Sequence, residues 1–251
     1  MKPDSAEVWL ADVDVAGPAL DRLGLQLSLA TPQDTARQAT LRDPRERERW
    51  LRARIILRLL LAVHIGLDAA RRPFIVSPTG KPAIAGDAGH AFSIAHSGAL
   101  VLIGIAAGAG IGVDVEVRHD ASVDDLRRRA IEAAAGALVP EVALPPTGAR
   151  RFMQAWTRLE ALAKASGRGI GPLLTALGVH GPASGLSVAE SPPVAHVLGQ
   201  GAAALRIEDL ALDPPAVGAV ALGRGASLEL RRLPACPSDD ADIRRLMLAS
   251  G

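Results

Sequence analysis

The sequence predicts an α+β protein built from two parts that meet near Gly110. Segments with the two-residue alternation of strands and segments with the 3.6-residue spacing of helices follow one another along the chain. The first part has the order strand, helix, strands, and the second has strand, helices, strands, so the two parts have a similar order of elements. The 251 residues suffice for one large domain or two small ones. We expect the parts to span residues 1–110 and 111–251.

In the first part, VWLADVDV (8–15) alternates like a strand, and the pattern is helical from Thr31 to about Leu67. Asp43-Pro44 has the form of a helix start inside that stretch, with Pro44 as its first residue. The segment SPTGKPAI (77–84) is rich in turn residues. AFSIAHSGALVLIGIA (91–106) then predicts two buried strands that are broken at Ser97-Gly98.

The second part opens with the strand IGVDVEV (111–117). A helix capped by Ser122 is expected to end near Gly136, and RFMQAWTRLEALAKASG (151–167) is the clearest helix, with Thr147 as its cap and Gly167 as its stop. Short apolar runs to about Leu233 predict an antiparallel sheet: LSVAE, AHVLG, LRIEDLAL, VGAVAL and SLELRRL. Past Pro234 we expect a weakly ordered tail until the amphipathic piece DIRRLMLAS.

Composition excludes several classes of protein. Hydrophobic residues make up 49% and charged residues 22%, which is ordinary for a globular chain. The formal charge of +1 and the 2% of aromatic residues argue against nucleic-acid binding. The single cysteine, Cys236, rules out an internal disulfide and any multi-cysteine metal site.

The sequence also argues against secretion and membrane insertion. The first 15 residues include several acids, whereas a signal peptide needs a basic start and an apolar core. The longest apolar run, Ile55–Ile65, is interrupted by Arg58 and His64 and is too short to span a bilayer. We therefore expect a cytoplasmic protein that makes no use of a membrane.

Two carboxylates stand in the otherwise apolar stretch IGVDVE (111–116). In a strand, Asp114 and Glu116 point to one face, and the valines between and beside them point to the other. Two like charges side by side repel, and a divalent cation is the simplest group that offsets this. The alternative is an edge strand with one face in solvent.

The helix at 151–166 carries Glu160 and Lys164, which lie on one face because they are four residues apart. This pair is either an ordinary surface ion pair or part of a site. A carboxylate from this helix would complete, with Asp114 and Glu116, the oxygen-rich set that Mg²⁺ uses together with substrate phosphate.

Three further features could bind anions. His96 is either a packed core histidine or a phosphate contact at a strand end. Gly80 and Lys81 form either an ordinary turn or an anion contact, and they do not form a P-loop. The arginine-rich segment from Arg42 to Arg58 is most simply a solvated face with interleaved acids, although its basic excess could hold a phosphate or an acidic partner.

The order and spacing of these motifs resemble those of a known family. GKPAI, FSIAHSG, IGVDVE and WTRLEALAKASGRGI follow one another as in the 4′-phosphopantetheinyl transferases of the larger, surfactin-synthetase-activating type. The resemblance runs from about Arg47 to Ile170. It implies two similar α/β halves in one chain, a pseudo-dimer, with coenzyme A in the cleft between them.

The resemblance also implies roles for individual residues. Asp114, Glu116 and Glu160 match the carboxylates that hold Mg²⁺, and Lys164 matches a lysine that contacts phosphate near the reaction centre. The residues that match contacts to the coenzyme A nucleotide are Lys81, His96, which faces the 3′-phosphate, and Arg54 in the first helix.

The implied reaction is the Mg²⁺-dependent transfer of 4′-phosphopantetheine from coenzyme A to a serine of an apo acyl or peptidyl carrier protein, with release of 3′,5′-ADP. The carrier could belong to fatty-acid, polyketide or nonribosomal-peptide synthesis. By analogy with the family we expect a monomer. Two alternatives remain at this point: a diverged, non-catalytic module that binds coenzyme A or a carrier protein, and an unrelated Mg²⁺-dependent phosphohydrolase.

Three departures from the family pattern motivate the non-catalytic alternative. Leu159 stands where a lysine usually precedes the helix glutamate, and Ala95 stands where a serine usually precedes the histidine. The phenylalanine-serine loop that helps to dock the carrier is not recognisable in RRRAIEAAAGALVP (127–140). We expect altered partner recognition rather than lost catalysis, because the three carboxylates and Lys164 are present.

Overall fold

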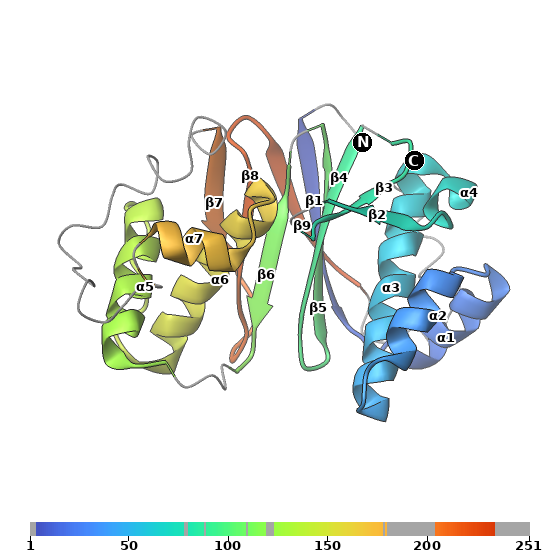
Figure 1. Ribbon diagram of the computed structural model, residues 1–251, viewed down its shortest axis with the longest axis horizontal. Coiled ribbons are helices and arrows are strands. Elements are labelled where there is room, and N and C mark those ends of the chain that lie inside the picture. The colour runs from blue at the N-terminus through green and yellow to red at the C-terminus, as the bar shows by residue number, and fades with distance from the viewer. Residues whose placement is uncertain are drawn as a thin grey trace.

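The protein is a four-layer α+β molecule in which two sheets lie face to face between two groups of helices (Figure 1). The computed structural model describes residues 4–77, 80–87, 89–108, 110–118, 123–177, 179 and 204–233. These residues form seven helices and nine strands. The predicted mixture of helices and strands is thereby confirmed, whereas the close similarity of the two halves stays a prediction.

The first sheet has the strand order β4-β5-β1-β9. β1 (Ser5–Asp12), β4 (His90–Ser97) and β5 (Leu100–Ala107) are antiparallel neighbours, and β9 (Ser227–Arg232) runs parallel to β1. The two predicted strands of residues 91–106 and their break at Ser97-Gly98 are confirmed. A short hairpin of β2 (Phe74–Val76) and β3 (Pro82–Ile84) carries the predicted turn segment beside this sheet.

Four helices cover the outer face of the first sheet: α1 (Gly17–Gln26), α2 (Pro32–Ala39), α3 (Pro44–Ile65) and α4 (Leu67–Ala70). The helical pattern predicted from Thr31 to about Leu67 is confirmed as two helices, α2, which Thr31 caps, and α3. The predicted start at Asp43-Pro44 is confirmed, since the Asp43 carboxylate accepts hydrogen bonds from the Arg45 and Glu46 amides. The sequence reading did not predict α1.

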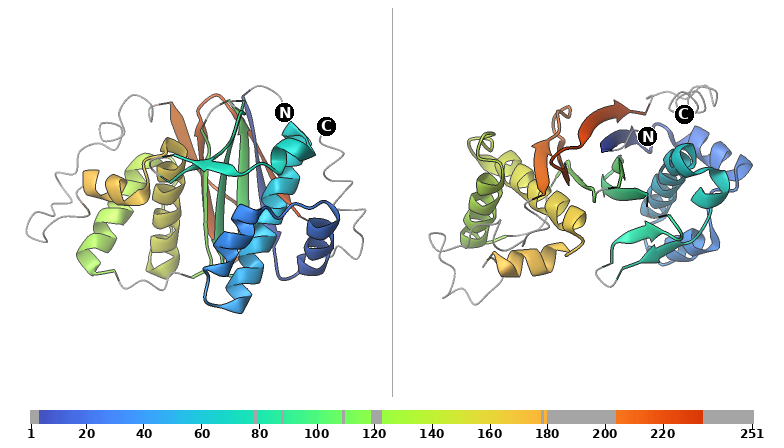
Figure 2. Two further views of the ribbon diagram at one scale, coloured as in Figure 1. Left: turned by 45° about the vertical axis from the view of Figure 1, so that its right-hand side comes forward. Right: turned by 90° about the horizontal axis from the view of Figure 1, so that it is seen from above.

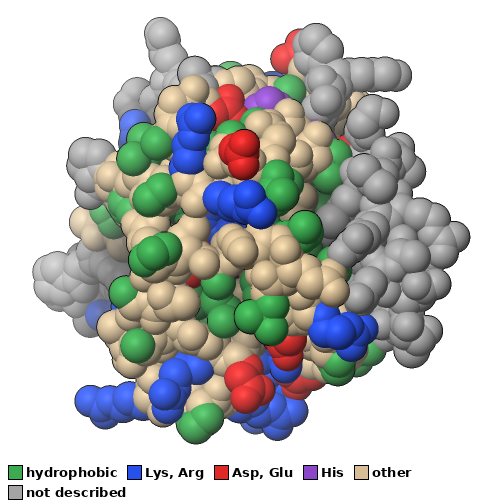
Figure 3. Space-filling model, turned by 90° about the vertical axis from the view of Figure 1, so that its right-hand side faces the viewer, with side chains coloured by type: hydrophobic (Ala, Val, Ile, Leu, Met, Phe, Trp, Pro, Cys, Tyr) green, Lys and Arg blue, Asp and Glu red, His purple; other side chains and the backbone are tan. Residues whose placement is uncertain are grey.

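The arginine-rich helix α3 is solvated only in its first turns. There Arg45 and Arg49 form ion pairs with Asp14. Arg58 is fully buried and donates from Nε to Asp34 at 2.8 Å, so a solvated face is wrong for this residue. On the surface over these helices, positive and negative side chains are interspersed (Figure 3).

The second sheet is antiparallel and has the order β6-β8-β7, formed by β6 (Gly112–Glu116), β8 (Val217–Gly223) and β7 (Leu205–Asp209). The last predicted strand, SLELRRL, does not extend this sheet as expected. It becomes β9 and joins the first sheet beside β1, so the last described strand returns to the first sheet (Figure 2).

Three helices cover the outer face of the second sheet: α5 (Asp125–Leu138), α6 (Gly148–Ser166) and α7 (Ile170–Ala176). The cap of α5 is Asp124, whose side chain accepts from the Arg127 amide, and not the predicted Ser122, which lies outside the described residues. α6 follows Thr147 and ends at Gly167 in the left-handed conformation, as predicted, although the Thr147 side chain makes no cap hydrogen bond.

Three apolar clusters hold the layers together. One lies between α1–α4 and the first sheet, one between α5–α7 and the second sheet, and one between the two sheets. Val8, Leu102, Val113 and Val220 are fully buried in the cluster between the sheets. Burial at roughly 25 cal/mol per Å² makes this contact the main attachment of one sheet to the other.

No helix within the described ranges is long and apolar enough to cross a membrane. The segments LSVAE and AHVLG and the tail beyond Leu233 lie outside those ranges.

Candidate functional site

The strand β6 places its acids on the side of α6. Val113 and Val115 are buried between the two sheets, and Asp114 on the opposite face contacts Lys164 of α6. The predicted alternation is therefore confirmed. A solvated edge strand is wrong for Asp114, which is only 7% exposed.

Gly112 allows the close approach of α6 to β6. A Cβ atom at this position would overlap the carbonyl oxygen of Ala161 and crowd the Ala165 amide. The absence of a side chain therefore fixes how near the acids of the strand lie to the helix that carries Glu160 and Lys164.

Two serines of β4 accept hydrogen bonds from backbone amides at β6, which is the edge strand of the second sheet. The Ser93 Oγ accepts a hydrogen bond from the Val113 amide at 3.1 Å. The Ser97 Oγ accepts from the Val117 amide at 3.0 Å and donates to Glu116 Oε2 at 3.0 Å. Ser97 thus orients the Glu116 carboxylate. The sequence reading missed both serines; their spacing of four along one strand was the available signal, because such residues share a face.

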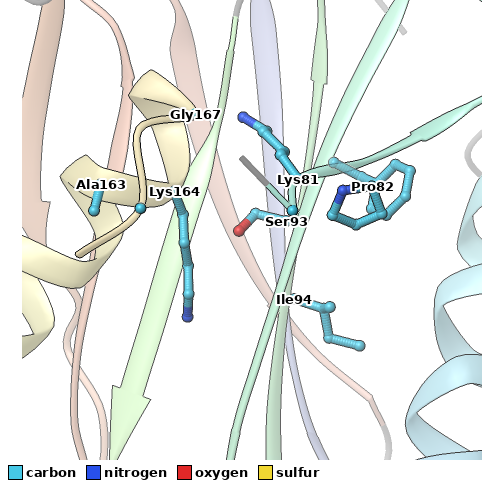
Figure 4. A pocket seen from close by; sticks show the side chains of 10 residues that line it. Lys81, Pro82, Ser93, Ile94, Ala163, Lys164 and Gly167 are labelled. Carbon is cyan, nitrogen blue, oxygen red and sulfur yellow. The ribbon is translucent and has the colours of Figure 1, made fainter. Parts of the chain in front are cut away.

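Two lysines donate hydrogen bonds to backbone carbonyl oxygens in or next to β6. Lys164 Nζ donates to Val113 O at 3.2 Å and to Asp114 Oδ1 at 2.7 Å. Lys81 Nζ donates to Ile111 O at 3.2 Å and to Ala165 O at 3.3 Å. Figure 4 shows both side chains, with Ser93, in the space between α6 and β4. Lys81 therefore connects the β2–β3 hairpin to the segment before β6 and to α6, both in the second part of the chain.

Glu160 lies one helical turn before Lys164 and is half-buried. Burial raises the pKa values of all three acids, Asp114, Glu116 and Glu160. The charge of Asp114 raises the pKa values of Glu116 and Glu160 further, and Lys164 acts in the opposite direction on each acid. The three acids thus share one electrostatic environment, as their predicted grouping requires.

The carboxylate oxygens of these three acids are suitable ligands for a divalent cation, but the acids do not form a complete set of metal ligands in this structure. Oδ2 of Asp114 is buried and has no hydrogen-bond partner, which leaves a carboxylate oxygen available as a ligand. The available ligands are carboxylate oxygens, which Mg²⁺ prefers. In the part of the chain that the structure describes, no three His, Cys, Asp or Glu side chains are yet grouped closely enough to hold a metal ion.

A pocket of about 200 Å³ opens beside the two lysines and is lined from both parts of the chain. Lys81 and Ser93 come from the first part, and Ala163, Lys164 and Gly167 come from the second. A second recess of about 160 Å³ lies farther along β4 and is lined by His96, Trp50 and Arg49. Both recesses follow the same strand, so an elongated ligand could contact both.

His96 lines the second recess, and Arg54 packs on Trp50, which lines it too. The His96 side chain reaches solvent, so the alternative of a packed core histidine is wrong. Partial desolvation in the recess lowers the pKa of His96, and the charges of Lys164 and Arg54 lower it further. Arg54 Nη1 is buried without a hydrogen-bond partner, and its guanidinium centre lies 4.8 Å from the Trp50 ring. Repulsion among the basic groups favours an anion, whereas Glu46, which lines the same recess, acts in the opposite direction.

Comparison with known proteins supplies the family. No family model matches the chain. HetI of Nostoc sp., a 4′-phosphopantetheinyl transferase, is 30% identical over 176 residues, which are 68% of this chain and 72% of HetI. This chain belongs to the 4′-phosphopantetheinyl transferase family. The Synechocystis sp. protein slr0495, named as a candidate 4′-phosphopantetheinyl transferase, is 29% identical over 172 residues, and the match spans 65% of its length.

The departures from the pattern of 4′-phosphopantetheinyl transferases lie in packed surroundings. Leu159 is fully buried in the apolar cluster between α6 and the second sheet, where the charge of a lysine would be costly to bury. Ala95 is buried between the two sheets, so its methyl group serves packing there. The segment 127–140 forms most of α5 and its end.

Proposed function

We propose that this protein transfers 4′-phosphopantetheine from coenzyme A to a serine of an apo acyl or peptidyl carrier protein, in a reaction that depends on Mg²⁺. Family membership supports the class of reaction. The observation that carries the assignment of the site is the buried acid Asp114, paired with Lys164 and electrostatically coupled to Glu116 and Glu160. The surfactin-synthetase-activating subtype and its two similar halves belong to the same proposal.

The cationic groups along β4 would bind the nucleotide of coenzyme A. In the proposal Lys81 contacts the nucleotide near the first recess, and His96 and Arg54 contact the 3′-phosphate at the second. The unpartnered Nη1 of Arg54 and the exposed ring of His96 support this placement. Neutralisation of several phosphate charges requires such fixed donors.

Asp114, Glu116 and Glu160 would hold Mg²⁺. When bound, the ion would neutralise negative charge on the diphosphate of coenzyme A, whose bond from the β-phosphorus to the bridging oxygen breaks when 3′,5′-ADP leaves. Ser97 keeps Glu116 in a fixed orientation, and Gly112 keeps β6 against α6, so two of the acids are positioned before any ligand arrives. Such preorganisation lowers the cost of forming the charged transition state.

Lys164 and Glu160 are the proposed catalytic residues. The Lys164 ammonium can hold a phosphate oxygen of the diphosphate while the carrier serine attacks the β-phosphate. Glu160 accepts the serine proton, directly or through water. Its partial exposure keeps it within reach of a partner.

A second candidate function is a non-catalytic module that binds coenzyme A or a carrier protein. The observation that favours it is the lack, within the described ranges, of a ready group of three metal ligands. The substitution of leucine for lysine at position 159 points the same way.

A transfer assay separates these two functions. The protein is incubated with coenzyme A, Mg²⁺ and a panel of apo carriers from fatty-acid, polyketide and nonribosomal-peptide synthesis, and the carriers are weighed by mass spectrometry. We expect one carrier to gain a phosphopantetheine group, and we expect Glu160→Gln to reduce the rate at least about a hundredfold while the fold persists. A panel that stays unmodified, although an unrelated transferase modifies it, contradicts the proposal.

A further inference from the structure

The acid cluster already contains a cation that belongs to the chain. Lys164 Nζ lies 2.7 Å from Asp114 Oδ1 and 3.2 Å from Val113 O. The Lys164 and Asp114 side chains are 30% and 10% exposed, so water screens their attraction only in part. The other carboxylate oxygen of Asp114 is buried and has no hydrogen-bond partner. One half of this carboxylate is therefore satisfied by the lysine and the other half is unsatisfied.

Lys164 opposes the binding of a divalent ion at Asp114, although Oδ2 of this carboxylate is available to the ion. Mg²⁺ lies about 2.1 Å from its oxygen ligands. An ammonium group hydrogen-bonded to the same carboxylate would then lie close to a doubly charged ion and repel it. The metal and the lysine thus compete for the one negative charge of Asp114, even where each binds a different carboxylate oxygen.

We propose that Lys164 is the resident cation of the resting site, and that it competes with the divalent cation for Asp114 until it turns toward a bound diphosphate. The inference rests on the proposed function, because it takes the three acids as the metal ligands.

The competition makes loading of metal and diphosphate cooperative. Phosphate oxygens offer the Lys164 ammonium a new anionic partner, and its departure frees Asp114 for the ion. Because linkage between two ligands is reciprocal, a bound metal equally favours the conformation in which Lys164 faces the diphosphate. Metal ions without a diphosphate bind weakly in this scheme.

The test measures metal binding in the absence of any reaction. Mg²⁺ alone is titrated calorimetrically into the full-length protein at a pH of about 8, where carboxylates are ionised. Wild type is compared with Lys164→Met, which keeps the length of the side chain without its charge, and with Lys164→Arg, which keeps a cation. Lys81→Met is the matched control. It also removes one lysine charge near the site, but Lys81 Nζ binds the backbone carbonyl oxygens of Ile111 and Ala165.

We expect Lys164→Met to bind Mg²⁺ on the order of tenfold more tightly than wild type, the fold-change that corresponds to loss of one charge-assisted hydrogen bond. Lys164→Arg and Lys81→Met should stay within about threefold of wild type, because the first keeps a cation at the acids and the second leaves Lys164 in place. The preformed Mg²⁺–pyrophosphate complex should bind wild type more tightly than Mg²⁺ alone, and Lys164→Met should reduce that ratio.

An affinity for Mg²⁺ that is unchanged or weaker in Lys164→Met overturns the inference, and so does an unchanged ratio. A gain of the same size in Lys81→Met also overturns it, because the effect would then reflect net charge alone. These failures differ from failure of the proposed function, which shows itself as an absence of carrier modification by the wild-type protein.

Discussion

At the scale of single residues, the site concentrates negative charge in a place that disfavours it. Burial raises the pKa values of Glu116 and Glu160 above their ordinary value of 4.5, and Asp114 adds to both shifts. Such groups cost stability in the ionised state, and this cost is the usual mark of a functional site. Lys164 offsets part of it in the resting protein.

The raised pKa of Glu160 predicts how stability depends on pH. Below about pH 4 the group is protonated in both the folded and unfolded states and contributes nothing. As the pH rises above 4.5, the unfolded state loses this proton first, so Glu160 destabilises the metal-free protein up to its folded pKa, and the full penalty persists above it. Glu160→Gln removes the penalty.

The measurement is urea unfolding of wild type and Glu160→Gln between about pH 4 and pH 8 in the presence of a chelator. We expect the variant to be more stable at neutral pH and the difference to vanish at the acidic end. Acids far from the site titrate equally in both proteins, so the difference reports Glu160 together with the relief of Glu116, whose pKa the Glu160 charge also raises. A variant that is less stable at neutral pH would show that this carboxylate stabilises the fold.

At the scale of elements, the contact between β6 and α6 decides the position of the acids. Gly112→Ala would place a methyl group on the carbonyl oxygen of Ala161, so either the strand or the helix must shift. We expect a loss of about 3 kcal/mol or more in unfolding free energy, as for other overpacked contacts, together with a loss of transfer activity.

Gly136→Ala is the matched control for that substitution. Gly136 lies inside α5, and no atom lies within 4 Å of an added Cβ. We expect this variant to gain about 0.5–1 kcal/mol, because alanine favours the helix. Chemical denaturation of both variants is the measurement, and equal effects of the two substitutions would refute the importance of the close approach.

The buried ion pair between Arg58 and Asp34 anchors α3. Nη1 of Arg58 also donates to Ala70 O and Arg72 O, so one side chain joins α2, α3 and the end of α4. Arg58→Met leaves the Asp34 carboxylate buried without its partner, and we expect a loss of about 3–5 kcal/mol. Adding Asp34→Asn should recover part of it, as thermal unfolding of the single and double variants can show; no recovery would contradict the role of the unpaired charge.

Local sequence patterns predicted the helices and strands better than they predicted which strands pair and which side chains meet. The strands of residues 91–106, β6 and α6 follow from periodicity and from Gly167 at the end of the helix. The predicted solvated face is wrong for Arg58 because its partner Asp34 is 24 residues away, and a local pattern does not reveal such a distant partner. The crossing of β9 to β1 could not be predicted, since a strand pattern does not specify its neighbour. The Asp114–Lys164 contact joins residues 50 apart and needed the fold.

At the scale of the whole molecule, the two sheets bring separate functional groups together. The apolar cluster between them places β4 beside β6, so Ser93 and Ser97 of one sheet bind the edge of the other. The pocket beside Lys81 and Lys164 is lined from both parts of the chain. Binding of coenzyme A at this junction is therefore expected to stabilise both parts against unfolding.

The most direct test is a crystal structure of the protein with coenzyme A and Mn²⁺ in place of Mg²⁺, in which anomalous scattering locates the ion. We predict one ion that binds carboxylate oxygens of Asp114, Glu116 and Glu160 at about 2.2 Å and touches the diphosphate, with Lys164 turned from Asp114 to a phosphate oxygen. An ion that is bound elsewhere, while these three acids remain without a metal, would contradict the account.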